Sequence, residues 1–194
     1  SSYDYCYGVA VQSDGKIIAP GDSNNGSNDD FALVRYNANG SLDTSFNGTG
    51  KVTTDIGGYD SGYGVAVQSD GRIVVAGDSS GDFALVRYHA NGSLDTSFNG
   101  TGKVTTPIGS SSDYGSSLVV QSDGKIVVAG VSYNGSNSDF ALGRYHAGGT
   151  LDTSVNGPGK GTPDTGRSGG PGYSVAVQSD GKIVTATGNF EVVE

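Results

Sequence analysis

The stretch that decides the fold spans residues 64–77 and reads Gly-Val-Ala-Val-Gln-Ser-Asp-Gly-Arg-Ile-Val-Val-Ala-Gly. An Asp-Gly pair between two runs rich in β-branched residues is a strong hairpin signal, because glycine adopts a positive φ without steric cost. We therefore expect a strand over residues 64–68, a tight turn over 69–71 and a returning strand over 72–77.

This hairpin extends into a unit of four antiparallel strands. Residues 83–88 alternate in the direction of their side chains and predict a third strand, and residues 103–106 predict a fourth after a segment rich in turn residues. No window of the chain carries an apolar period typical of a helix. The sequence predicts an all-β protein.

The unit is copied in tandem along the chain. The phrase Val-Gln-Ser-Asp-Gly begins at Val11, Val67, Val120 and Val177, and Asp-Phe-Ala-Leu follows the first three copies. We divide the chain into repeats of approximately 1–56, 57–109, 110–166 and 167–194, the last incomplete, within a single domain of residues 1–194. Such repeats bury their apolar faces against one another.

Tandem four-stranded units of this length favour a β-propeller over a β-solenoid or a β-sandwich. Two arrangements stay open. Either the N-terminal hairpin pairs with the last strand near Phe190 and closes a four-bladed ring, or the chain is part of a larger propeller. Two copies sharing one ring, a homodimer, is a further alternative. The chain contains no Met, so we expect it to be a processed product or a fragment.

The composition argues against several classes of function. The formal net charge of −9 disfavours a nucleic-acid partner, which requires a basic face. No apolar run is long enough for a transmembrane helix, so we expect no membrane insertion. The single cysteine, Cys6, cannot form an internal disulfide and is interpreted as a partly buried thiol without a functional role.

The copies differ in their loops and in the third repeat. Residues 23–29 and 132–138 predict longer loops between the second and third strands, and loops of this kind often carry function. In the third repeat, residues 157–163 are expected to replace the fourth strand. The glycines and prolines from Pro163 to Gly172 predict a mobile loop.

No catalytic or metal-binding motif stands out. Residues 35–43 resemble a calcium-binding loop in spacing, but Arg35 occupies the first ligand position, so calcium is disfavoured and no cofactor or metal is predicted. Asp43 and Asp95 are expected to accept hydrogen bonds from local backbone N–H groups instead. His89 and His146 replace Asn37 at one repeat position and are interpreted as exposed turn residues.

Six residues form the candidate ligand-binding set. Three acids precede the first strand of their repeats, and three tyrosines lie close to them in sequence: Asp4, Asp60, Asp113, Tyr7, Tyr63 and Tyr173. At one ring opening they would form an acidic, aromatic mouth suited to sugar hydroxyls or cations. The alternative is that they are turn acids and half-buried tyrosines that pack between blades.

Two phrases carry a family resemblance: residues 35–46, Arg-Tyr-Asn-Ala-Asn-Gly-Ser-Leu-Asp-Thr-Ser-Phe, and residues 11–17, Val-Gln-Ser-Asp-Gly-Lys-Ile. The chain resembles the delta-60 repeat over essentially its whole length. That family is bacterial, largely secreted or on the cell surface, β-propeller-like and mostly without assigned function. The resemblance implies a propeller and export, and it transfers no catalytic residue.

The leading hypothesis is a secreted or cell-surface β-propeller without catalytic activity that recognises a protein or a glycan through its loops or ring mouth. The first alternative is a hydrolase with a site at the propeller mouth, built from divergent residues around Tyr133 or Asp29. The second is a structural spacer within a surface protein.

Overall fold

The computed structural model describes residues 3–109, 111–155, 159–162, 172–187 and 192–193. These residues form four antiparallel β-sheets, each built from one repeat with its strands in chain order. The first sheet contains β1 (Asp4–Cys6), β2 (Ala10–Val11), β3 (Ile17–Asn24), β4 (Asp29–Tyr36) and β5 (Lys51–Thr54). The second contains β6 (Asp60–Val67), β7 (Ile73–Ser79), β8 (Asp82–Tyr88) and β9 (Lys103–Thr106). The third contains β10 (Asp113–Val120), β11 (Ile126–Tyr133), β12 (Ser138–Tyr145) and β13 (Lys160–Gly161), and the fourth β14 (Gly172–Val177), β15 (Ile183–Thr187) and β16 (Val192–Val193).

The hairpin predicted from residues 64–77 forms as expected. The Gln68 N–H donates to the Arg72 carbonyl at 2.8 Å, and the Gly71 N–H donates to the Gln68 carbonyl at 2.9 Å. Gly71 has a φ of 84°, which closes the three-residue loop with a left-handed residue. The all-β class and the four-stranded unit are therefore confirmed, and the part of the chain described here contains no helix that could cross a membrane.

The first strand of the later repeats contains a β-bulge that the sequence did not reveal. In the second repeat the register of β6 against β7 shifts between Gly62 and Gly64, and β10 and β14 shift at the equivalent position. In the first repeat the ladder is interrupted there, although the Tyr7 N–H still donates to the Pro20 carbonyl at 3.1 Å, so β1 and β2 are separate strands. A bulge increases local twist and changes the direction of nearby side chains.

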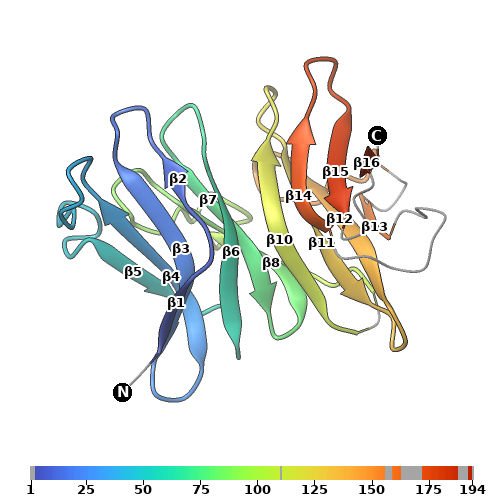
Figure 1. Ribbon diagram of the computed structural model, residues 1–194, viewed down its shortest axis with the longest axis horizontal. Helices are drawn as coiled ribbons and strands as arrows, with labels where there is room; N and C mark the ends of the chain where they lie inside the picture. The colour runs from blue at the N-terminus through green and yellow to red at the C-terminus, as the bar shows by residue number, and fades with distance from the viewer. Residues whose placement is uncertain (1–2, 110, 156–158, 163–171, 188–191, 194) are drawn as a thin grey trace.

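The sheets follow one another across the molecule and pack face to face (Figure 1). Ile18, Phe31, Leu33 and Phe46 of the first repeat pack on Ile73, Val75, Ala84, Val86 and Tyr88 of the second. Val74, Ala76, Phe83, Leu85, Phe98 and Val104 of the second pack on Ile126, Val128, Ala141 and Tyr145 of the third, and Val127, Ala129 and Phe140 of the third pack on Val175 of the fourth. Each inner sheet is thus buried on both faces, as propeller blades are.

A closed ring is not confirmed. Among the strands that the structure describes, no sheet joins the N-terminal strands to the C-terminal ones, and the two ends lie on opposite sides of Figure 1. Phe190, to which the closure prediction referred, lies outside the described residues.

The longer loops predicted for the first and third repeats are confirmed, as turns of residues 25–28 between β3 and β4 and of residues 134–137 between β11 and β12, whereas only residues 80–81 connect β7 to β8. Two other local predictions need correction. Cys6, expected to be partly buried, is exposed. The third repeat also keeps a short fourth strand, since Lys160 and Gly161 pair with Gly143 and Leu142. Backbone pairing needs no particular side chain, so the glycines did not prevent it. Residues 163–171, expected to form a mobile loop, lie outside the described residues.

The repeated phrase of residues 35–46 forms an interlock between successive repeats. In the second repeat, Arg87 donates from Nε to Asp95 at 2.8 Å and lies 4.6 Å over the centroid of the Phe98 ring. Its Nη1 reaches into the third repeat and donates to the Ala147 carbonyl at 2.5 Å. Arg35 makes the same contacts with its own repeat and with Ala90 of the second. The repeated phrase of residues 35–46 therefore helps to pack each repeat against the next.

Candidate binding surfaces

The predicted mouth acids separate into two environments. Asp60 is fully buried and accepts the N–H groups of Ile56 at 2.6 Å and Gly57 at 3.3 Å. Asp113 is equally buried and accepts those of Ile108 and Gly109. Asp4 is exposed and accepts a hydrogen bond from the Ser23 hydroxyl at 2.7 Å. Asp60 and Asp113 thus hold the segment that links two sheets, while Asp4 faces solvent.

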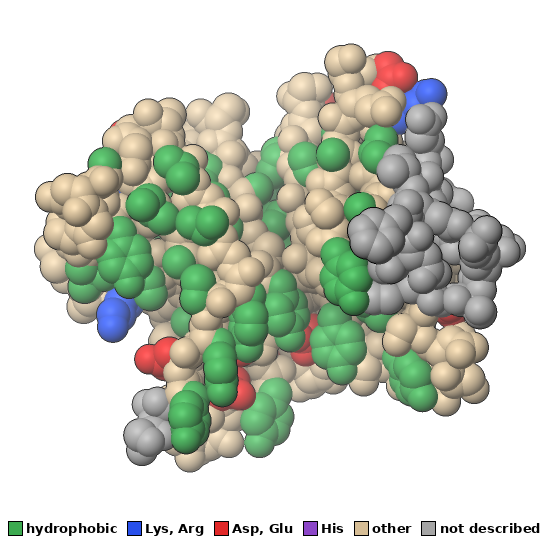
Figure 2. Space-filling model, viewed as in Figure 1, with side chains coloured by type: hydrophobic (Ala, Val, Ile, Leu, Met, Phe, Trp, Pro, Cys, Tyr) green, Lys and Arg blue, Asp and Glu red, His purple; other side chains and the backbone are tan. Residues whose placement is uncertain are grey.

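Tyrosines gather along the first strand of the first repeat. The rings of Tyr3 and Tyr5 lie 6.5 Å apart, those of Tyr5 and Tyr7 6.2 Å, and those of Tyr7 and Tyr63 5.0 Å. Tyr3 is 70% exposed, Tyr5 55% and Tyr7 47%. We call Tyr3, Tyr5, Tyr7 and Tyr63 the tyrosine row. Figure 2 shows hydrophobic side chains gathered on this face over β1 and toward the centre of the molecule.

Buried aspartates anchor the inner end of the tyrosine row. The Tyr7 hydroxyl donates to Asp22 at 3.1 Å, and the Ser61 hydroxyl donates to the same Asp22 oxygen at 2.9 Å. Burial, followed by the charge of Asp22, raises the pKa of Tyr7 from 10.0 to about 12. Burial also raises the pKa of the neighbouring Tyr63 hydroxyl, and the Asp78 charge adds to the effect. Both hydroxyls therefore stay protonated at neutral pH, and the Tyr7 hydroxyl uses its proton in the bond to Asp22.

The structure brings only part of the predicted set together. Tyr7 and Tyr63 are in ring contact, and Asp4 lies on the same short strand as Tyr5. Tyr173 on β14 is 63% exposed and has no ring contact with any other described aromatic residue. Sequence reasoning missed Tyr3 and Tyr5, although the alternation of tyrosine over residues 3–7 was a visible signal for one strand face. It also missed Asp22, which no local pattern distinguishes.

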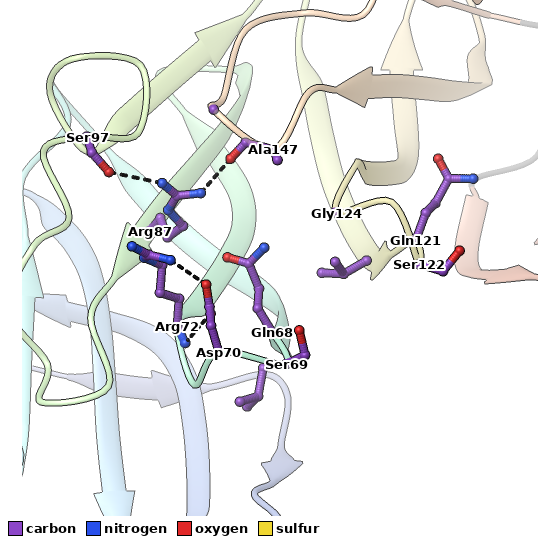
Figure 3. Close-up of a pocket in the computed structure, with 13 residues that line it drawn as sticks. Gln68, Ser69, Asp70, Arg72, Arg87, Ser97, Gln121, Ser122, Gly124 and Ala147 are labelled. Carbon is purple, nitrogen blue, oxygen red and sulfur yellow. Dashed lines mark hydrogen bonds and ion pairs between the residues drawn. The ribbon is translucent and has the colours of Figure 1, made fainter.

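A polar groove lies between the hairpin turn that connects β6 to β7 and the one that connects β10 to β11. It has a volume of about 680 Å³ and is lined by the β6–β7 turn, with Gln68 and Ser69, and by the β10–β11 turn, with Gln121 and Ser122. In Figure 3 the two turns stand on either side of the groove, and Arg87 lies on the side of the β6–β7 turn, where it is hydrogen-bonded to Ser97 and Ala147. Residues of the repeated phrase Val-Gln-Ser-Asp-Gly thus line the groove, and no aromatic side chain is among its lining residues.

The outer face of the first sheet is the third surface. In the second sheet the residues that face the preceding sheet, including Val75, Val86 and Tyr88, are fully buried. No described sheet precedes the first one, and there Val9 is 66% exposed and Val11 68%. A pocket of about 270 Å³ lies at this face, lined by Ala19, Ala32, Val34 and Tyr36 among others. These residues occupy the strand positions of Val75, Ala84, Val86 and Tyr88.

The segment that resembles a calcium loop holds an ion pair. Asp43 accepts from Arg35 Nε at 2.8 Å and lies 3.2 Å from Lys16 Nζ. It also accepts the N–H and hydroxyl of Ser45, as the local-turn interpretation expected. The Ser45 hydroxyl bond and these cations hold the pKa of Asp43 well below its usual range, against the effect of burial. A different group of acids, Asp30, Asp55 and Asp60, places one oxygen from each side chain within 4.8 Å of the others.

The histidines do not form a catalytic relay with their serine neighbours. His89 Nε2 lies 3.7 Å from Asp95, while the Ser97 hydroxyl donates directly to the same Asp95 oxygen at 2.6 Å. A nucleophilic serine needs the base between itself and the acid, and this order is absent here. The Tyr133 hydroxyl donates to the Gly135 carbonyl, and Asp29 accepts from Asn24. These partners are those of turn residues.

Comparison with known proteins identifies the family. The family model described as Domain of unknown function (DUF5122) beta-propeller matches residues 12–46, 68–98 and 121–154, just over half of the 194 residues. Each matched segment begins at the Asp-Gly hairpin turn and extends past the buried aspartate that pairs with arginine, which is Asp43, Asp95 or Asp152. A comparison with the curated proteins found no match. The chain therefore belongs to this beta-propeller family, whose function is unknown.

Proposed function

We propose that the protein is a secreted or cell-surface recognition module without catalytic activity, and that it binds glycans through the tyrosine row. The observation that carries the proposal is the exposure of three stacked tyrosines, Tyr5 in β1 and Tyr3 and Tyr7 directly before and after that strand. Large aromatic side chains that stay exposed in a row are typical of binding surfaces rather than of inert ones.

The chemistry of the tyrosine row favours a sugar ligand over a protein ligand. Aromatic faces stack on the C–H surfaces of sugar rings, and the exposed carboxylate of Asp4 can accept hydrogen bonds from their hydroxyls. The resemblance to the delta-60 repeat supports export. The hydrolase alternative has less support, because the side chains of Tyr133 and Asp29 hydrogen-bond to neighbours within their own hairpins and no hydrogen bond joins a described serine to a histidine base.

Glycan binding by the tyrosine row is testable on a glycan array, followed by calorimetry with any glycan that binds. We expect Tyr5→Ala to weaken binding about tenfold, since a lost aromatic contact costs roughly 1.5 kcal/mol. Tyr59→Ala is the matched control, because Tyr59 is 65% exposed and makes no ring contact with the row.

Equal weakening by Tyr5→Ala and Tyr59→Ala, or an array without any bound glycan, would remove support for the tyrosine row as the site. A panel of ester and glycoside substrates run in parallel separates binding from hydrolysis, and turnover of any of them would favour the hydrolase.

The outer face of the first sheet supports a second candidate role, self-assembly. Its residues match in type and position those that bury themselves against a preceding sheet elsewhere in the chain. In the second sheet the Tyr88 hydroxyl also donates to Thr54 of the first sheet at 2.7 Å, and Tyr36 occupies the equivalent position. We propose that a second copy of the chain packs on this face, which would complete a ring or extend the array.

Sedimentation velocity over a range of protein concentrations tests self-assembly. We expect wild type to form a dimer or a larger species, and Val11→Asp to shift it to the monomer, because a charge cannot be buried between sheets without a partner. Tyr59→Asp adds the same charge at another exposed position and should leave assembly unchanged. A wild type that stays monomeric at every concentration contradicts this role.

A further inference from the structure

Three carboxylates converge where the first sheet meets the second. Asp30 lies in β4, Asp55 follows β5, and Asp60 opens β6, so the group is assembled from two repeats. One oxygen from each carboxylate lies within 4.8 Å of the other two. Asp60 is fully buried and Asp30 is 7% exposed, while Asp55 is open to solvent.

Two of these carboxylates have an oxygen that nothing in the described chain satisfies. Asp30 Oδ1 and Asp60 Oδ1 are buried and accept no hydrogen bond from any described residue. Their second oxygens are occupied: Asp30 Oδ2 accepts from Asn25 at 3.0 Å, and Asp60 Oδ2 accepts the Ile56 and Gly57 N–H groups. A buried carboxylate oxygen without a partner is costly, and like charges nearby increase the cost.

An ammonium group beside the cluster, that of Lys103, is directed to a backbone atom. Lys103 Nζ donates to the backbone carbonyl of Asp55, and no ion pair within the described residues joins it to Asp30, Asp55 or Asp60. The cluster therefore has an excess of negative charge that a bound cation would balance.

The next junction provides an internal comparison. Between the second and third sheets, Asp82 and Asp113 occupy the positions of Asp30 and Asp60, but Pro107 stands where Asp55 would be. Both oxygens of Asp113 have partners there, since Gly109 donates to both and Ile108 to Oδ2. The third acid and the unsatisfied buried oxygens thus occur together at the first junction, which is what a specific site would require.

We propose that Asp30, Asp55 and Asp60 bind a calcium ion between the first and second sheets. Carboxylate oxygens are hard ligands, and the group contains no thiolate or imidazole that would favour zinc. Calcium binds oxygen at about 2.3–2.6 Å, so ligands on opposite sides of one ion lie roughly 5 Å apart, which suits the spacing of this cluster. Exposed Asp55 provides the path of entry, and water completes the shell.

This site differs from the sequence-local loop of residues 35–43, in which the acid is paired with arginine. It joins two repeats, so calcium would fix one blade relative to the next. It is also independent of the tyrosine row and of the glycan proposal.

Calorimetric titration of the chelator-treated full chain with calcium chloride tests the site. We expect one site in wild type and at least a tenfold loss of affinity in Asp55→Asn, whose exposed position keeps the fold intact. Asp82→Asn, the equivalent acid at the second junction, removes the same charge and should leave affinity unchanged. Calcium should also raise the melting temperature of wild type and of Asp82→Asn, and should raise it less in Asp55→Asn.

Absence of both binding heat and a melting shift in wild type would overturn the proposal. Equal losses of affinity in Asp55→Asn and Asp82→Asn would overturn it too, because binding would then follow net charge alone. A magnesium titration run alongside tests the identity of the ion, and magnesium that binds as tightly as calcium would refute the choice of calcium.

Discussion

We expect the free energy of unfolding of an Asp95→Ala variant to be about 3–5 kcal/mol lower than that of wild type, because the substitution leaves a buried charge without its counterion. Asp95 is 1% exposed and lies 2.8 Å from Arg87 Nε and 3.0 Å from Arg72 Nε. Arg87 in turn bridges to the third repeat through the Ala147 carbonyl, so the loss extends beyond one loop. Urea denaturation followed by circular dichroism measures the difference.

Asp70→Ala is the matched control for Asp95→Ala. Asp70 also pairs with Arg72, but its side chain is 48% exposed, so its removal should cost less than about 1 kcal/mol. Similar losses in the two variants would show that burial does not set the strength of this ion pair.

The stabilisation by Asp95 should depend on pH in a defined direction. Burial would raise its pKa, but the Ser97 hydroxyl and the Arg87 charge outweigh burial and lower the pKa from 3.8 to about 2. A lowered pKa means that the ionised form stabilises the fold above the unfolded value, and that this stability is lost as pH falls through about 2. The gap between wild type and Asp95→Ala should therefore be full at pH 7 and narrow in strong acid.

A Gly77→Ala variant is the second large effect we expect, with its free energy of unfolding lowered by about 3 kcal/mol. A Cβ added at Gly77 would lie 1.8 Å from the Ser61 carbonyl oxygen and 2.9 Å from the Phe31 ring. The first contact is with the backbone of the paired strand, which cannot move aside without opening β6 from β7 at the bulge. A Cβ added at Gly21 or at Gly130 would lie 1.7 or 1.8 Å from the equivalent carbonyl oxygen.

Thermal unfolding of Gly77→Ala beside Gly148→Ala checks this reason. A Cβ at Gly148 would meet no atom within 4 Å, and Gly148 does not have a left-handed φ. We expect Gly148→Ala to stay within about 0.5 kcal/mol of wild type, as most surface changes do. If Gly77→Ala is as stable as Gly148→Ala, the strands are not held as closely as the structure indicates.

Much of the fold was readable from short segments. The Asp-Gly turn, the alternation of residues 83–88 and the copying of both phrases predicted the hairpins, the third strand and the succession of sheets. The errors occurred where composition was taken for conformation. Glycine at residues 157–163 argued against a strand, yet Lys160 and Gly161 pair with β12, because pairing depends on backbone atoms already presented by the neighbour.

The candidate sites were less readable. Asp60 and Asp113 looked like mouth residues, but their carboxylates face backbone N–H groups of the preceding linker, and Asp4 differs from both although it stands at the same repeat position. Repetition in sequence therefore does not give equal exposure, since a residue in the first sheet has no described neighbour on one side.

The sequence alone determined that this protein consists of copied antiparallel units whose apolar positions require burial, because hairpin turns and strand alternation depend on residues close together in the chain. Only the tertiary structure decided which copies of a residue are covered, which tyrosines meet, and that Asp30, Asp55 and Asp60 converge. Those contacts join different strands or different repeats, and their distances depend on how one sheet lies against the next.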